Sequence, residues 1–97
     1  MIVQRITYNV KPGRMQEVVA LAAEQKVRYA GVVPVRVYGP GLSPPDTLAI
    51  EFEFENVAAL DALWSRMGAD PAWMAFMEKW NALMAGGGTN NTWTLVE

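Results

Sequence analysis

The chain has 97 residues, a length that suits one domain, and its formal net charge is −2. It contains no Cys, which excludes disulfides and thiolate chemistry, and no His, which excludes imidazole bases, Ser-His-Asp triads and His-ligated haem. The acidic balance disfavours nucleic acid and anionic membranes as partners, and no apolar run is long enough to span a bilayer. We therefore expect one cytoplasmic domain over residues 1–97.

The first third of the chain is predicted to form a strand, a helix and a strand. Residues 2–10 alternate between apolar and polar side chains as a half-buried strand does, except that Gln4 falls on the apolar parity. Apolar residues at helical spacing follow over residues 14–29. Residues 32–39 alternate again, and Pro34 favours an edge position because proline cannot donate to a sheet ladder.

The stretch Thr47–Phe54, which follows a loop rich in Pro and Gly, has the most regular pattern in the chain. Its even-numbered positions are all apolar, whereas its odd-numbered positions include Glu51 and Glu53. Because successive strand side chains point to opposite faces, one face of this strand is apolar and the other carries carboxylates. A central strand of this kind needs helices on its apolar side.

Two helices and a last strand complete the chain. Asn56 is a good N-cap for a helix over residues 57–67, and Asp70-Pro71 combines a cap with the residue favoured at the first helical position. The tryptophans and methionines that follow lie at helical spacing, and we interpret them as core.

The last strand is predicted over residues 91–97, with Trp93 on one face and Thr92 on the other, polar, face. The predicted elements follow the order strand, helix, strand, strand, two helices and strand. This is the order of the α+β, ferredoxin-like (split βαβ) fold, in which an antiparallel four-stranded sheet carries helices on one face. In this fold the first and third strands are central neighbours, which brings Arg5 within pairing reach of Glu51.

The candidate functional residues lie on the sheet face opposite the helices. Arginine can hold an enolate or carboxylate by charge-assisted hydrogen bonds, and a desolvated Glu51 could act as a base. The candidate catalytic residues are Tyr38, Arg36 and Glu51. The candidate ligand-binding residues are Arg5, Thr7, Asn9, Glu53 and Thr92. A cross-strand ion pair between Arg5 and Glu51 is the simpler alternative, and two carboxylates without a third ligand predict no metal site.

Three segments resemble the NIPSNAP-type branch of the dimeric α+β barrel superfamily, which also contains an antibiotic-biosynthesis-monooxygenase-like branch. They are Tyr8–Gly13 (YNVKPG), Ile50–Leu60 (IEFEFENVAAL) and Asp70–Trp73 (DPAW). The last is similar to the Asp-Pro-x-Trp that opens the third helix in that branch. Where the NIPSNAP pattern has a Glu and an Arg in the first strand, this chain has Gln4 and Ile6.

The resemblance implies a homodimer whose sheets pack face to face, with a small-molecule pocket in each subunit, either between sheet and helices or in the lumen. We expect no cofactor, since the haem-binding relatives depend on a His that this chain lacks. We expect a NIPSNAP-like protein that binds a small, largely apolar molecule, phenolic or carboxylate-bearing, in a pocket on the sheet. Two alternatives stay open. One is a cofactor-independent monooxygenase or isomerase acting on an acidic or phenolic ring compound. The other is a structural or regulatory dimer with a packed lumen.

Overall fold

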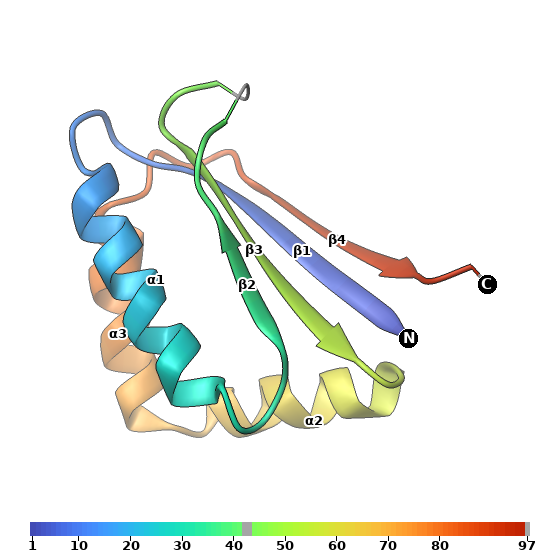
Figure 1. Cartoon of the computed structure of the whole chain (residues 1–97). Coiled ribbons are helices and arrows are strands. Elements are labelled where there is room, and N and C mark those ends of the chain that lie inside the picture. The colour runs from blue at the N-terminus through green and yellow to red at the C-terminus, as the bar shows by residue number, and fades with distance from the viewer. Residues whose placement is uncertain (42–43, 97) are drawn as a thin grey trace.

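The computed structural model of the chain describes residues 1–41 and 44–96. Within these residues, four strands form one antiparallel sheet and three helices cover one of its faces (Figure 1). The elements in chain order are β1 (Ile2–Asn9), α1 (Met15–Tyr29), β2 (Val35–Tyr38), β3 (Thr47–Phe54), α2 (Val57–Gly68), α3 (Pro71–Ala82) and β4 (Thr89–Thr94). This is the predicted ferredoxin-like α+β fold. Residues 42–43 of the predicted loop and Glu97 of the predicted last strand lie outside the described residues.

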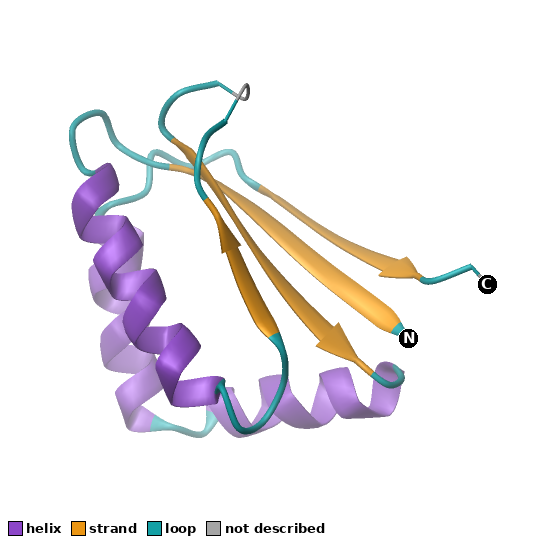
Figure 2. Ribbon diagram, in the orientation of Figure 1, coloured by secondary structure: helices purple, strands orange, loops and turns teal. Residues whose placement is uncertain are grey.

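The strands are ordered β2-β3-β1-β4, so the two longest strands are central (Figure 2). In the antiparallel register of β1 and β3, Ile2 lies opposite Phe54 and Arg5 lies opposite Glu51, which confirms the predicted pairing. The side chains of Leu48, Phe52 and Phe54 are buried toward the helices. No helix of residues 1–41 and 44–96 covers the other face of the sheet (Figure 1), and we call it the open face.

The apolar core beneath the sheet is divided into two clusters. The first joins α1 and α3 to one end of the sheet through Val10, Val18, Ala22, Leu48, Phe76, Trp80 and Leu83. The second joins α2 to the other end through Tyr29, Phe52, Phe54, Leu63 and Met67. Trp73 at the start of α3 packs against both clusters, so the clusters meet around its ring.

Both predicted helix caps are present. The Asn56 side-chain oxygen accepts a hydrogen bond from the Ala59 amide at 2.9 Å, which satisfies a free donor at the start of α2. Asp70 accepts from the Ala72 amide at 2.9 Å, and Pro71 follows it at the start of α3. These caps explain why the chain breaks one helix and starts another within a few residues.

Thr92 of the last strand was predicted to lie on the face opposite the helices, and this prediction was wrong. β4 begins at Thr89, and its register with β1 sets Thr92 opposite Gln4 and Trp93 opposite Val3. Since Gln4 is buried toward the helices, Thr92 lies on the helix side of the sheet, and Trp93 lies on the open face. The reason is that no helix covers β4: all its residues are exposed, so the bulkier side chains have no buried side to prefer.

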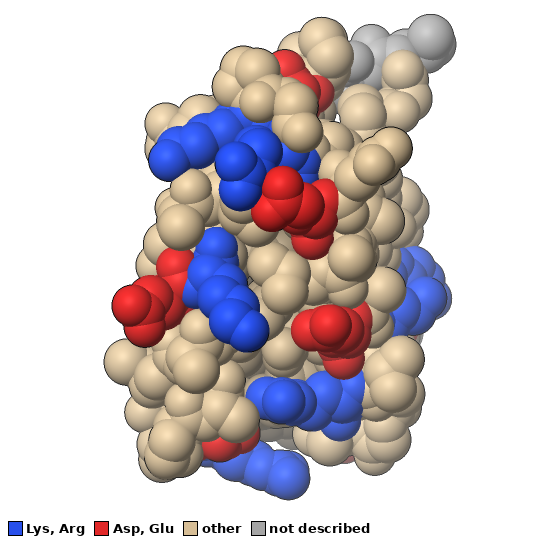
Figure 3. Space-filling view, turned by 90° about the vertical axis from the view of Figure 1, so that its left-hand side faces the viewer, with Lys and Arg blue, Asp and Glu red and all other residues tan. Residues whose placement is uncertain are grey.

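The outer surface of the helices carries mixed charge. Figure 3, which views this side of the molecule, shows basic and acidic side chains interspersed, with no extended patch of one sign. On α1, for example, Arg14 Nε lies 2.9 Å from Glu17 Oε1. Among the helices of the described residues, none combines the length and the hydropathy that crossing a membrane requires.

Candidate functional site

Four charged side chains on the open face form a ladder of ion pairs across three strands. Arg5 of β1 donates to Glu51 Oε2 of β3 from Nε (3.0 Å) and Nη2 (2.7 Å). Arg36 of β2 hydrogen-bonds Glu53 of β3, which raises the pKa of the Arg36 guanidinium, and its Nη1 lies 3.9 Å from Glu51 Oε1. Each carboxylate therefore has an arginine partner, as in the ion-pair alternative that the sequence suggested.

A shallow hollow beside this ladder brings three of the predicted site residues together. It has a volume of about 300 Å³, and its lining includes Arg5, Thr7 and Tyr38. Tyr38 is 44% exposed, so the hollow lies open to solvent in the single chain. A ligand bound here would keep one side in water unless a second chain covered it, whereas usual ligand sites bury most of the ligand.

Two predicted residues, Asn9 and Thr92, belong neither to the hollow nor to the ladder of ion pairs. Asn9 donates from Nδ2 to the Gly86 carbonyl oxygen at 2.9 Å and thereby holds the glycine-rich connection that leads into β4. Thr92 lies on the other side of the sheet, as its register with Gln4 requires. Among the other predicted residues, Arg5 pairs with Glu51 and Arg36 pairs with Glu53. Arg5, Thr7 and Tyr38 line the hollow.

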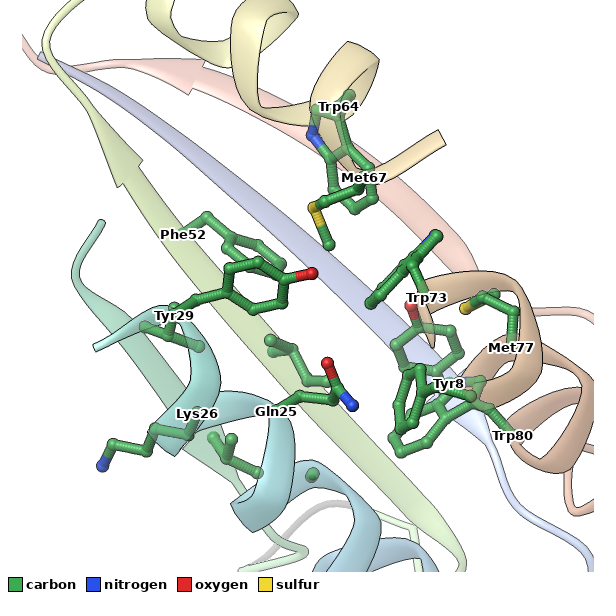
Figure 4. A pocket seen from close by; sticks show the side chains of 15 residues that line it. Tyr8, Gln25, Lys26, Tyr29, Phe52, Trp64, Met67, Trp73, Met77 and Trp80 are labelled. Atoms are coloured by element: carbon green, nitrogen blue, oxygen red, sulfur yellow. The ribbon is translucent and has the colours of Figure 1, made fainter. Parts of the chain in front are cut away.

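A second cavity lies on the helix side of the sheet, where the two core clusters meet (Figure 4). Its walls include a continuous series of six aromatic rings, and we call it the aromatic pocket. Consecutive ring centroids are separated by 5.0 Å (Tyr8–Trp80), 5.5 Å (Trp80–Phe76), 5.2 Å (Phe76–Trp73), 6.0 Å (Trp73–Trp64) and 5.6 Å (Trp64–Phe52). Such edge-to-face and tilted contacts fix the rings against one another.

The aromatic pocket is small. It leaves about 30 Å³ of space for water-sized molecules. One water needs at least about 10–15 Å³ on this measure, so the pocket has room for two or three at most. Met67 and Met77 also line it, and methionine side chains adapt readily to a new occupant because they are unbranched and flexible. A ligand would enter by displacing these flexible side chains.

Buried polar atoms distinguish this pocket from a plain apolar core. Gln25 of α1 directs its amide into the cavity between the rings of Tyr29 and Tyr8, whereas Lys26 points away from it (Figure 4). Gln25 Oε1 and Trp80 Nε1 are buried and have no hydrogen-bond partner among the described residues. Burial raises the pKa of the Tyr8 phenol to about 12, so this group is neutral at ordinary pH.

Gln4, the residue that breaks the apolar pattern of β1, orients one wall of the aromatic pocket. It is 6% exposed, its Oε1 accepts from Trp64 Nε1 at 2.7 Å, and its Nε2 donates to Asn90 Oδ1 at 3.1 Å. A buried amide needs such partners, and this one fixes the indole of Trp64 against Phe52. The break in the apolar pattern of the first strand is thus part of the pocket.

The resemblance left open a pocket between sheet and helices, but none of the residues predicted for the site lines the aromatic pocket. The tryptophans at helical spacing were interpreted as core, which is correct for Trp80 at 1% exposure, whereas Trp64 and Trp73 are half-buried at the cavity wall. Gln25 was not singled out. The available signal was the placement of side chains with polar tips, including Gln4 and Tyr8, at positions that the periodicity assigns to the apolar face.

Sheet, helices and pocket together define an α+β protein of ferredoxin-like type with a ring-lined cavity under the sheet. Among solved structures, the chain is similar to an uncharacterized NIPSNAP domain protein from Burkholderia xenovorans, with 15% identity, 99% of this chain and 95% of that chain covered, and a TM-score of 0.85. It is similar to a NIPSNAP family protein from Agrobacterium tumefaciens, with 17% identity, coverage of 99% and 93%, and a TM-score of 0.84.

An antibiotic biosynthesis monooxygenase is also similar, with 20% identity, 100% of both chains covered and a TM-score of 0.76. At these identities the likeness establishes the fold, and at that level it confirms the resemblance drawn from the sequence. A scan against protein-family models and a search of curated proteins found no match.

Proposed function

We propose that the protein is a homodimer that binds a small, largely apolar aromatic molecule in the aromatic pocket of each subunit. The observation that carries this proposal is a ring-lined cavity in which two buried polar atoms, Gln25 Oε1 and Trp80 Nε1, lack partners among the described residues. Folded proteins pair nearly all such atoms, and small-molecule sites are mostly apolar with a few convergent polar groups. Usual ligand sites have about 300–1,000 Å³. This pocket must therefore open by moving side chains before it admits a ligand, and a pocket that stays packed would favour the structural dimer instead. The proposed site therefore lies on the helix face of the sheet rather than on the open face.

The open face supports the proposed dimer. Tyr38 is 44% exposed and Trp93 is 60% exposed there, on opposite edge strands of the sheet. Large aromatic side chains gathered on one face of a small domain are typical of a surface that a partner covers. A second copy packed sheet to sheet would bury both rings and cover the hollow beside Tyr38.

Calorimetric titration with small planar aromatics such as naphthalene and 2-naphthol tests ligand binding. We expect saturable binding that is lost in Met77→Trp, because the larger side chain fills the little space that the pocket has. Met74→Trp is the matched control, since Met74 lies on the same helix and is 59% exposed. If the native protein binds none of the probes, or if both variants bind equally well, the proposal is wrong.

A second candidate is a cofactor-independent monooxygenase acting on a phenolic ring compound. The likeness to an antibiotic biosynthesis monooxygenase over the full length of both chains favours it. Oxygen uptake with a panel of hydroquinones, corrected for the protein-free rate, tests it. Uptake that falls in Tyr8→Phe and persists in Arg36→Ala would support oxygenation in the aromatic pocket, and uptake equal to the protein-free rate would exclude the activity for those compounds.

A further inference from the structure

We infer that Gln25 selects the ligand of the aromatic pocket, and that the ligand is an uncharged aromatic molecule presenting a hydroxyl or N–H group to the Gln25 side-chain oxygen. This inference rests on the proposed function, since it requires an aromatic ligand in this pocket. It adds the chemical class of the ligand and the residue that recognises it.

The position of Gln25 on α1 is unusual for a polar residue. The buried residues of this helix are Val18, Ala22 and Tyr29, and position 25 continues the same stripe at three and four residues from its neighbours. An apolar side chain would satisfy this position without leaving a polar atom unpaired. The glutamine instead holds a buried oxygen with no partner among the described residues, which disfavours folding unless something else pairs with it.

An unpaired carbonyl oxygen requires a donor. A ligand hydroxyl or N–H would complete the hydrogen bonding of Gln25 in its present orientation, whereas a ligand ether or carbonyl oxygen at the same place would require the amide to turn over and present Nε2. The space of about 30 Å³ also admits a water at this place, so the ligand group would replace a water that pairs with the amide.

The charges around the pocket exclude an anion. Lys26 is part of the lining, but its ammonium points away from the cavity (Figure 4), and Arg5 and Arg36 form ion pairs on the other side of the sheet. The Tyr8 phenol is neutral at ordinary pH, and burial raises its pKa further, to about 12. An ionised ligand would therefore lose its hydration without gaining a counter-charge, which is strongly unfavourable. This argues against the carboxylate-bearing ligand that the sequence left open.

Calorimetric titration with three probes of matched shape tests the inference: 2-naphthol, 2-methoxynaphthalene and 2-naphthoate. A neutral hydrogen bond corresponds to an affinity ratio of about five- to tenfold, so we expect 2-naphthol to bind tighter than the methoxy compound by this factor, and 2-naphthoate to bind most weakly. Gln25→Leu should bring the two neutral probes to within about twofold of each other. Gln16→Leu, an exposed position on the same helix, should keep the preference.

The outcomes of this titration test the inference and the proposed function separately. Binding of both neutral probes with equal affinity by the native protein, or binding of 2-naphthoate as tightly as 2-naphthol, overturns the inference and leaves the proposed function intact. A preference for 2-naphthol that survives in Gln25→Leu assigns recognition to another residue and also overturns it. Failure of all three probes to bind overturns both. Circular dichroism of each variant verifies that the fold is retained.

Discussion

Trp80 is the side chain through which α3 is fixed to the centre of the sheet. It is 1% exposed, and its ring meets Tyr8 of β1 edge-to-face at 5.0 Å. We expect Trp80→Ala to lower the free energy of unfolding by about 3–5 kcal/mol, because the neighbouring rings cannot fill the cavity left behind. Chemical denaturation measures this loss, and Met74→Ala on the exposed side of the same helix should change stability by less than about 0.5 kcal/mol. Native stability in Trp80→Ala would contradict the core role.

Tyr8 should make stability depend on pH in the alkaline range. Burial raises the pKa of its phenol from 10.0 to about 12, so between these values the unfolded chain has released the proton and the folded chain still holds it. The contribution of this group is thus fully present below pH 10.0 and is lost as the pH rises toward 12. Its size is on the order of 2–3 kcal/mol.

Denaturation of the native protein and of Tyr8→Phe across this pH range measures the effect. Other groups titrate equally in both proteins, so the difference between the two curves isolates Tyr8. We expect the unfolding free energy of Tyr8→Phe to decline less steeply. Parallel curves would show that the phenol is not held neutral by burial.

At the scale of elements, local patterns predicted most of the fold. Strand β3 was predicted to the residue, because its alternation reports burial on one side and water on the other. The starts of α2 and α3 were predicted because a cap such as Asn56 or Asp70 acts on amides only two or three residues away. The side of the sheet on which each β4 side chain lies was not predictable in this way. Thr92 and Trp93 are both exposed, so burial does not distinguish them, and only the register with β1 determines their sides.

The lining of the aromatic pocket escaped prediction for a different reason. Its walls come from segments that are distant in the sequence, such as Gln25 on α1, Trp64 on α2 and Trp80 on α3. Helical spacing shows that each of these side chains faces the sheet. It does not show whether they fill the space between them or leave a cavity, because this depends on how the helices are placed. The ion pair between Arg5 and Glu51 was predictable because strand order alone brings these residues together.

The entry to β4 depends on Gly88. A Cβ at this position would clash with the Thr7 carbonyl oxygen, a backbone atom of a central strand that cannot move aside. We expect Gly88→Ala to destabilise the protein by about 1–3 kcal/mol and to speed amide hydrogen exchange most strongly in β4. Gly68→Ala is the control, since a Cβ at the end of α2 meets no atom within 4 Å. Similar small effects of both substitutions would refute the close contact.

At the scale of the whole molecule, the sheet is covered on one face and bare on the other. A domain of this size buries only about 60–65% of the surface of its unfolded chain, which leaves its stability marginal without a partner. We expect light scattering over a dilution series to show a dimer, and Trp93→Glu to shift it toward monomer because a carboxylate would be buried at the interface. Met74→Glu on the helix side should stay dimeric. A native protein that is monomeric at every concentration would rule out sheet-to-sheet pairing.

Dimerisation and ligand binding should be separable, because the open face and the aromatic pocket lie on opposite sides of the same sheet. If the ligand binds in the aromatic pocket, monomeric Trp93→Glu should bind 2-naphthol with an affinity within about threefold of the native value, a difference of less than 1 kcal/mol. If the ligand binds instead in the hollow lined by Arg5, Thr7 and Tyr38, the site is complete only when a second copy covers it, and monomerisation should abolish binding. Titration of this one variant therefore distinguishes the two candidate sites, with Met74→Glu as the dimeric control.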